Sequence, residues 1–289
     1  MIMVMSGNSY RKVLVETFKA FDIFCRRNDI KYYAAYGTLI GAVRHHGLIP
    51  WDDDIDVWML PVDYQRFCSL KGHVAGHYDI MDMRDEGYWL FDLVKFVDTN
   101  TTLWEYYNHP CITGVYIDIF PLAECNYSDG VALKKRYDKV SYLVDRSMMI
   151  HSLGELRTII ENEKWRELKF YLYDIICMPF AKGMWRNKYK QCLKEIRKCS
   201  GDKFLSYECF YKEKEVFNKE WFSGVIETDF EDIRIGVPSG FDSILRQLYG
   251  DYMQLPPEDK RESHHSFYFL DLDRRWSINE IKNIKKSKQ

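Results

Sequence analysis

The sequence predicts an α/β (α+β) fold in which helices flank a sheet and a further group of helices follows it. Short β-favouring runs recur through roughly the first 125 residues and are separated by helical patterns. From Asp129 to about Cys199, apolar residues recur at helical spacing among many charges. The chain has 289 residues, which is enough to bury a hydrophobic core without disulfides.

Helices and strands are expected to alternate in the first part of the chain. The apolar residues of 10–28 share one helical face, which predicts an amphipathic helix. A short β-rich run at 30–36 ends at Gly37-Thr38, where the chain turns into a short helix over 39–43.

The next run, 55–59, alternates acidic and apolar residues and predicts a strand. Pro61 then suits the first turn of a helix over 62–70. Further strands are expected at 78–83, 90–97 and 115–120.

After the charged helical region, the pattern over 217–255 begins like a hairpin and continues as a helix over 241–249. Gly250 and Pro256-Pro257 end that helix. Residues 281–289 are expected to be a frayed basic tail.

Composition narrows the class of protein. Lys plus Arg (41) nearly balance Asp plus Glu (43), so the chain as a whole does not attract nucleic acid, and an anion site must be local. The eight cysteines contain no C-x-x-C pair, which favours reduced thiols over a zinc site. The first residues lack the pattern of a secretion signal, and no run reaches the ~18 apolar residues of a membrane span. We therefore expect a cytoplasmic protein.

Four carboxylates crowd five positions in Trp51-Asp-Asp-Asp-Ile-Asp-Val57, and such a like-charge cluster destabilises the fold unless a cation neutralises it. On a strand, residues two apart face the same way, so Asp54 and Asp56 are expected to aim together. Two oxygen ligands with positions left for water and phosphate suit Mg²⁺.

A third acid, Asp118, lies inside the apolar β-favouring run 115–120, where a lone charge requires a partner. The alternative is a solvated acidic turn and an Asp118 at a strand edge. The spacing and the strand context favour a shared cation site.

Gly37 and Thr38 place a tight turn and a hydroxyl at a helix N-terminus, where backbone N–H groups can hold a phosphate. Arg44 lies further along the same segment and can bind an anion bidentately. Alone, a Gly-Thr turn more often only caps a helix, but here it precedes the paired acids.

A Gly-Thr turn, an Asp-x-Asp strand and a third Asp on another strand together resemble the polymerase-β-like nucleotidyltransferase centre. Residues 36–57 (YGTLIGAVRHHGLIPWDDDIDV) resemble the signature block of the LicD family, to which the fukutin-related proteins are also similar. Three later segments are similar to the same family: 116–122 (YIDIFPL), 249–253 (YGDYM) and 255–265, which contains Leu-Pro-Pro, Arg261, His264 and His265.

The resemblance implies a mixed nucleotidyltransferase sheet flanked by helices, with a helical insertion. It divides the chain into a catalytic core (1–125), a helical insertion that determines acceptor specificity (126–215) and a C-terminal segment that completes the active site (216–289). The zinc-binding cysteines of the family's animal members have no counterpart here.

The activity implied by the resemblance is transfer of a substituted phosphate, phosphocholine or a polyol phosphate, from a CDP-activated alcohol to a hydroxyl of a glycan or lipid-linked oligosaccharide. The product is a decorated surface polysaccharide such as lipopolysaccharide or teichoic acid. By position, Asp54, Asp56 and Asp118 are expected to hold Mg²⁺ or Mn²⁺. Asp118 or Asp53 is expected to take the acceptor's proton.

The donor phosphates are expected to contact Gly37, Thr38, Arg44 and Lys95, together with His264 and His265. Lys95 lies inside an apolar strand pattern, so it either extends to the surface or faces the anion site. For the two histidines, a solvated loop is an equal alternative.

Other features allow a structural and a functional interpretation. Trp51 and Trp58 are expected to pack in the core rather than stack on a base, and Trp104, Tyr106 and Tyr107 form a candidate aromatic shelf for a choline-like cation or cytosine. The basic stretch 182–198 fits either a surface helix docked on the core, which we favour, or peripheral contact with the inner membrane surface.

Two other enzyme classes use similar acids. An NTP-dependent nucleotidyltransferase would release pyrophosphate where the predicted enzyme releases CMP. A metal-dependent glycosyltransferase also uses Asp-x-Asp, but it needs a dinucleotide-binding βαβ start that this chain lacks. A non-enzymatic glycan-binding module is expected to have lost one of the three acids.

Overall fold

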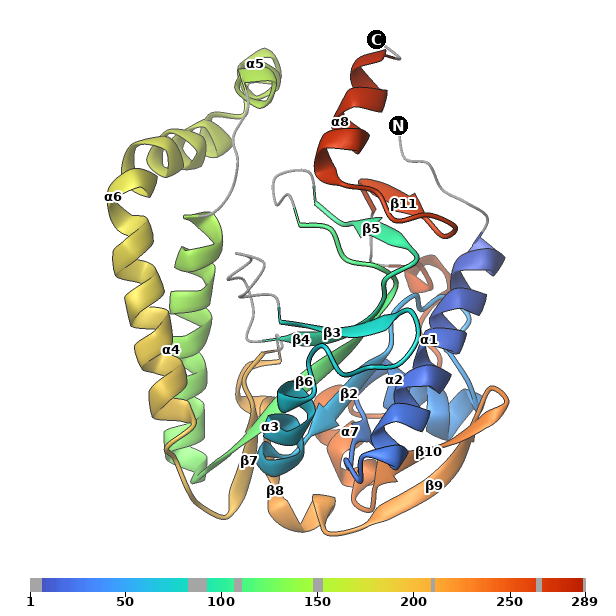
Figure 1. The fold of residues 1–289 in the computed structure, drawn as a ribbon. Helices are drawn as coiled ribbons and strands as arrows, with labels where there is room; N and C mark the ends of the chain where they lie inside the picture. The colour runs from blue at the N-terminus through green and yellow to red at the C-terminus, as the bar shows by residue number, and fades with distance from the viewer. Residues whose placement is uncertain are drawn as a thin grey trace.

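The protein was analysed as a computed structural model, which describes residues 7–82, 93–106, 111–147, 153–208, 211–263 and 267–287. It has the expected α+β architecture, with a mixed sheet, helices packed against it and a long helical hairpin beside it (Figure 1). The helices are α1 (Gly7–Arg27), α2 (Tyr36–Ile40), η1 (Gly41–His45), α3 (Pro61–Ser69), α4 (Tyr127–Arg146), α5 (Leu153–Glu161), α6 (Trp165–Ile196), η2 (Lys212–Glu215), η3 (Lys219–Phe222), α7 (Phe241–Tyr249), η4 (Glu258–Lys260) and α8 (Ile278–Ser287).

Within the described residues, seven strands form the main sheet, whose central order is β1-β2-β6-β4-β3, and β7 and β8 extend it from β6. Among the strand pairs that the structure describes in this sheet, only β2 and β6 run parallel. These strands are β1 (Tyr33–Ala34), β2 (Asp56–Met59), β3 (Tyr78–Asp82), β4 (Val94–Asp98), β6 (Tyr116–Cys125), β7 (Lys203–Ser206) and β8 (Val216–Asn218). Two further antiparallel pairs are formed by β9 (Val225–Phe230) with β10 (Ile233–Pro238), and by β5 (Thr102–Trp104) with β11 (Phe269–Asp271).

Helices α1 and α3 cover one face of the sheet through aromatic side chains. Phe21 of α1 packs edge-on against Phe96 of β4 and Phe67 of α3. On the other face, Trp58 of β2 is fully buried and packs against Tyr36 and Phe217. The sheet therefore has an apolar layer on each side, as the period-2 pattern of its strands requires.

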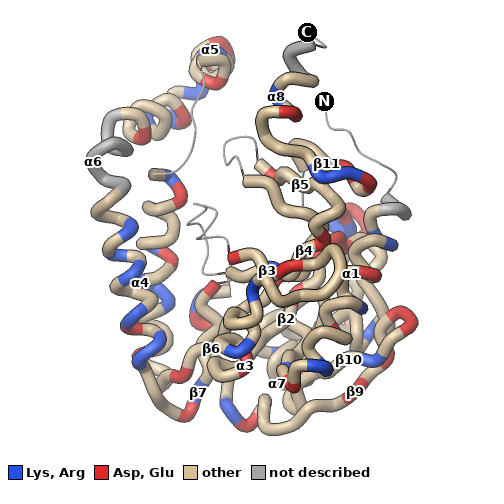
Figure 2. Tube along the Cα trace, viewed as in Figure 1, with Lys and Arg blue, Asp and Glu red and all other residues tan. Residues whose placement is uncertain are grey.

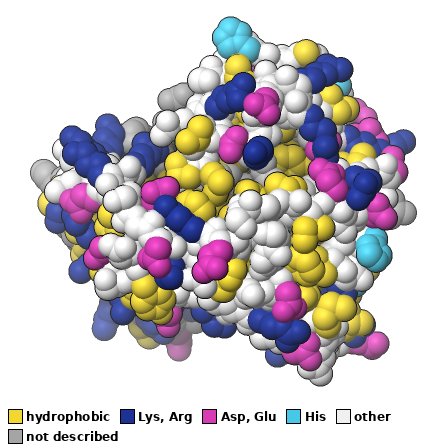
Figure 3. All heavy atoms as spheres, turned by 90° about the horizontal axis from the view of Figure 1, so that it is seen from below, with side chains coloured by type: hydrophobic (Ala, Val, Ile, Leu, Met, Phe, Trp, Pro, Cys, Tyr) yellow, Lys and Arg dark blue, Asp and Glu magenta, His cyan; other side chains and the backbone are white. Residues whose placement is uncertain are grey.

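The basic stretch at 182–198 is docked on the protein, as expected. Tyr189, Cys192, Leu193 and Ile196 are buried in a second apolar cluster with α4 and β7. Basic residues recur along α4 and α6, interspersed with acidic ones (Figure 2). Seen from below, the surface also mixes both signs of charge with apolar groups (Figure 3).

Residues 281–289 were expected to be a frayed tail, but 281–287 lie in helix α8, so this prediction was wrong for the described part of the tail. Ser277 and Glu280 form a reciprocal cap at the start of α8, because the Ser277 N–H donates to Glu280 Oε2 (2.8 Å) and the Glu280 N–H donates to Ser277 Oγ (3.3 Å). Ile281 is buried beside Trp104 and Phe269. The cap and this contact make a basic segment helical.

Trp104, expected as part of an aromatic shelf, belongs to the same small core. Its indole is fully buried against Tyr268, at a centroid distance of 4.7 Å. Trp58 packs in the core as predicted, and Trp51 is partly buried. Tyr107 lies outside the described residues, and Tyr106 is about half exposed (49%).

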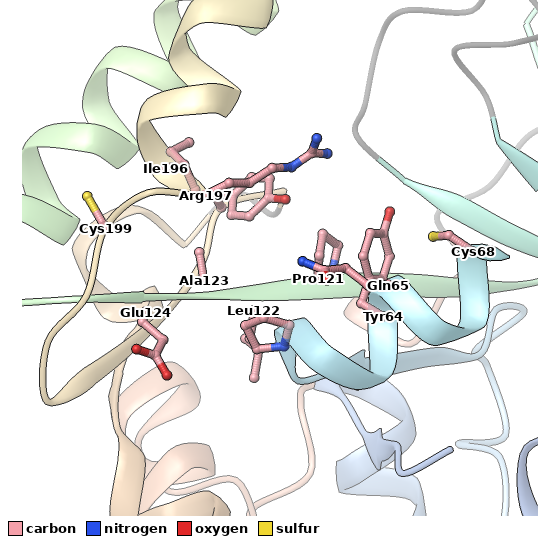
Figure 4. Close-up of a pocket in the computed structure, with 12 residues that line it drawn as sticks. Tyr64, Gln65, Cys68, Pro121, Leu122, Ala123, Glu124, Ile196, Arg197 and Cys199 are labelled. Carbon is pink, nitrogen blue, oxygen red and sulfur yellow. The ribbon is translucent and has the colours of Figure 1, made fainter. Parts of the chain in front are cut away.

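A cavity of about 440 Å³ lies between α3, β6 and the end of α6. Pro121 and Ala123 point toward it from β6, and Tyr64 and Gln65 face it from α3 (Figure 4). None of the predicted acids lines this cavity.

Candidate active site

The parallel pairing of β2 with β6 brings two of the predicted acids together. Asp56 is the register partner of Asp118, so both side chains leave the sheet on the same face, one strand spacing apart. The Asp118 N–H donates to the Ile55 carbonyl (3.0 Å), which fixes this register one residue before β2 begins. Residues 62 positions apart in the chain therefore share one site.

Asp54 lies just before β2 and adds a third charge. Its carboxylate contributes to raising the pKa of both Asp56 and Asp118. Asp52, Asp53 and Asp54 also place carboxylate oxygens within 4.8 Å of one another. The loop and the two strands thus concentrate negative charge at one point.

Burial and like charge act together on these carboxyls. The pKa of Asp56 is raised well above its ordinary value, first by burial and then by Asp54 and Asp118. The pKa of Asp118 is raised by burial, against the opposing effect of Lys95. A divalent cation would relieve both effects, and an all-oxygen donor set suits Mg²⁺ or Mn²⁺.

Lys95 faces the acids rather than the solvent. It is the β4 register partner of Asp118, and its Nζ lies 2.6 Å from Asp118 Oδ1. The same Nζ lies 3.3 Å from the centroid of the Tyr116 ring. Because the side chain is buried, the ammonium group is fixed between a carboxylate and an aromatic face.

The Gly-Thr turn supports the start of β2. Thr38 is buried, and its Oγ1 accepts the backbone N–H of Asp56 (2.8 Å). Gly37 packs so closely on Asp52 that a Cβ there would lie 2.5 Å from Oδ2. The turn therefore positions the acid segment, and its predicted contact with phosphate stays a prediction.

Arg44 lies in the last part of η1, a single π-helical turn, and binds the C-terminal segment. Its Nη1 donates to the carbonyls of Tyr252 and Gln254, and its Nε donates to His45 Nε2 (2.9 Å). Burial lowers its pKa, and within the described part of the chain no carboxylate pairs with it. A half-buried guanidinium without an acid partner can still bind an anion.

The structure adds site residues that the sequence did not suggest. Tyr116 donates its hydroxyl to Glu105, and the pKa of buried Tyr10 is raised by burial and by the charges of Asp53 and Asp54. Tyr116 is two residues before Asp118 on β6, so period-2 reasoning could have found it. Glu105 and Tyr10 carry no comparable local signal.

The structure describes only part of the segment 255–265, which was predicted to contact the donor phosphates through His264 and His265. Ser263 donates to Asp53 Oδ2, and the Arg261 guanidinium lies 5.4 Å from the centroid of the Trp51 ring. The segment therefore reaches the acid loop. His264 and His265 lie outside the described residues.

A mixed sheet that brings carboxylates together from a loop and two strands defines a nucleotidyltransferase-type centre. Residues 29–149 match the family model described as LicD/FKTN/FKRP, nucleotidyltransferase domain. The matched range contains the acids of the site described above, which are Asp52, Asp53, Asp54, Asp56, Glu105 and Asp118.

The curated relatives are consistent with that match. Lipopolysaccharide cholinephosphotransferase LicD of Haemophilus influenzae is 30% identical over 253 residues, which are 85% of this chain and 90% of that protein. Uncharacterized proteins of Rickettsia typhi and Rickettsia prowazekii match shorter stretches, at 51% over 44 residues and 54% over 37 residues, each about a seventh of either chain. The chain belongs to the LicD family and is a transferase of that type.

No helix in the described part of the chain is long and apolar enough to cross a membrane.

Proposed function

We propose that this protein transfers a substituted phosphate, phosphocholine or a polyol phosphate, from a CDP-activated alcohol to a glycan hydroxyl of a surface polysaccharide. The observation that carries the proposal is the pairing of Asp56 with Asp118 beside Asp54, in a buried and like-charged cluster. The Haemophilus influenzae relative is a lipopolysaccharide cholinephosphotransferase, which favours phosphocholine as the transferred group and lipopolysaccharide as the acceptor.

Asp54, Asp56 and Asp118 would hold Mg²⁺ or Mn²⁺, which neutralises charge on the reacting phosphate. The protein's own groups position the reactants. Lys95 fixes Asp118, and Thr38 fixes Asp56. Arg44 is half-buried and has no acid partner among the described residues, and we propose that it contacts a donor phosphate.

The acceptor oxygen forms a new bond to phosphorus while the bond from phosphorus to the CMP oxygen breaks. CMP leaves with the electron pair of that bond, and the hydroxyl proton passes to a carboxylate. Asp53 suits this role better than Asp118, because Asp118 is paired with Lys95 whereas Asp53 is partly exposed and accepts from Ser263.

Donor binding tests the proposal before any acceptor is known. The protein would be melted with Mg²⁺ and, separately, CDP-choline, CDP-glycerol, CDP-ribitol, ATP and UDP-sugars, because a ligand of the folded state raises the melting temperature. We expect one CDP compound to stabilise the protein in a metal-dependent manner, and Asp56→Asn to weaken that effect. Asp229→Asn, which changes an exposed acid on β9, is the matched control.

A response to ATP alone would favour the nucleotidyltransferase alternative, and a response to UDP-sugars alone would favour the glycosyltransferase. Either result would contradict the proposal.

A further inference from the structure

A second ionic cluster is buried away from the acids, where three distant segments meet. Lys134 of α4 and Glu215 of η2 are 1% and 0% exposed, and Lys134 Nζ lies 3.2 Å from Glu215 Oε2. Lys134 also donates to Asp138 one turn along α4. Burying such a pair costs several kcal/mol of desolvation, so it is poor evidence of a purely stabilising role.

The other oxygen of Glu215 leads toward the catalytic turn. Glu215 Oε1 accepts the hydroxyl of Tyr36 at 3.2 Å, and the same hydroxyl lies 2.7 Å from Ser206 Oγ. Tyr36 directly precedes Gly37 and Thr38, and Thr38 holds the Asp56 N–H. An ion pair, the Tyr36 hydrogen bond, the backbone of residues 36–38 and the Thr38 hydrogen bond therefore connect α4 to the first residue of β2.

Tyr36 also touches the two acid-bearing strands. Its ring packs edge-on against Trp58 (4.8 Å) and Phe120 (5.1 Å). These residues follow Asp56 and Asp118 by two positions, so they leave their strands on the same face as the acids. The ring thus lies against both strands next to the carboxylates.

The backbone of Tyr36 needs outside support. Its φ of 43° lies in the left-handed region, which is unfavourable for a bulky residue and persists only when the surroundings impose it. The hydroxyl contacts and the ring contacts are the features that hold this residue in place.

We propose that Glu215 and Lys134 are positioning residues, which hold Tyr36 by its hydroxyl and so set the Gly37-Thr38 turn and the spacing of Asp56 and Asp118. Helix α4 then contributes to the geometry of the centre and not only to the acceptor side. The activity readout of this inference rests on the proposed function, but the structural readout does not.

The variants separate the hydroxyl contact from the fold. Tyr36→Phe removes only the hydroxyl. Lys134→Met/Glu215→Leu replaces the buried pair with apolar groups of similar volume, a change that is often neutral or stabilising. Glu215→Gln keeps an acceptor for Tyr36 and serves as the conservative rescue. Tyr127→Phe, at an exposed tyrosine (56%) on α4, is the matched control.

Two measurements need no donor: amide hydrogen exchange over residues 36–45 and 55–59, and titration with Mn²⁺ followed by electron paramagnetic resonance. For Tyr36→Phe and the double variant we expect faster exchange in both segments and roughly tenfold weaker Mn²⁺ binding, while each variant still unfolds in a single cooperative transition. With an active donor, kcat should fall by about 10²-fold while the donor KM changes little, as for displaced reacting groups. Glu215→Gln should resemble the wild type.

Wild-type exchange and Mn²⁺ binding in both Tyr36→Phe and the double variant would overturn the inference. If instead exchange responds as expected but the wild type transfers nothing from any CDP donor, the positioning role stands and the proposed function fails.

Discussion

Lys95 neutralises part of a carboxylate cluster that the fold itself assembles. Its ammonium group, 2.6 Å from Asp118, faces the combined charge of Asp118, Asp54 and Asp56. Alternation within the strands predicted which face these acids occupy. The pairing of Lys95 with Asp118 depends on the β4–β6 register, which no local pattern specifies.

Lys95→Met should destabilise the protein when no metal is added, by about 3–5 kcal/mol, because it leaves Asp118 as a buried charge without its partner. Added Mn²⁺ should restore part of the loss. Urea unfolding in EDTA measures the loss of stability, and urea unfolding with Mn²⁺ measures the recovery. Lys12→Met, at an exposed lysine of α1, is the control. Equal loss in both conditions would show that Lys95 acts independently of the metal site.

Asp53→Asn should separate proton transfer from metal binding. We expect it to lower kcat by ~10²–10⁴-fold, the usual contribution of a general base, while Mn²⁺ affinity stays near that of the wild type. Asp56→Asn should lower both kcat and Mn²⁺ affinity. If Asp53→Asn kept full kcat, Asp118 would become the candidate base.

At the scale of elements, periodicity located those whose boundaries are local. Helix α7 spans Phe241–Tyr249 as predicted, and the hairpin before it is β9–β10. Strand β6 extends beyond the prediction, through Pro121 to Cys125. Pro121 falls between the end of pairing with β4 at Ile119 and its start with β7 at Leu122, so tertiary pairing tolerates a residue that usually ends strands.

The π-helical turn η1 depends on one close backbone approach. A Cβ at Gly41 would lie 2.5 Å from the Gly47 carbonyl oxygen, a backbone atom that cannot rotate away. Gly41→Ala should therefore lower the free energy of unfolding by about 1–3 kcal/mol. Gly183→Ala in α6, where nothing lies within 4 Å of a Cβ, should raise it by about 0.5–1 kcal/mol. Denaturant unfolding compares the two, and equal effects would contradict this account of the turn.

Across the whole molecule, the helical hairpin and the sheet are joined by a separate apolar cluster and by the buried pair of Lys134 and Glu215. Sequence patterns predicted the sheet, the helical region that follows it and the docking of 182–198. They did not predict this pair, because its members lie 81 positions apart and each resembles a surface charge in its own segment.

The buried pair predicts a pH dependence of stability. Burial raises the pKa of Glu215 from 4.5 to about 7. Between these values the folded state keeps a proton that the unfolded state releases, so the contribution of Glu215 falls as pH rises through this window, by ~3 kcal/mol in all. As the pH rises from 5 to 8, the free energy of unfolding of Glu215→Gln, measured in urea, should therefore increase by about that amount relative to the wild type. A difference that does not change with pH would contradict the burial of an ionisable group there.

The most direct measurement is the release of CMP from CDP-choline, with purified lipopolysaccharide as the acceptor and phosphocholine on the product detected by mass spectrometry. The account predicts CMP release that requires Mg²⁺ or Mn²⁺, is retained in Asp229→Asn and falls at least ~10²-fold in Asp56→Asn. Transfer that continues undiminished in EDTA or in Asp56→Asn would contradict it.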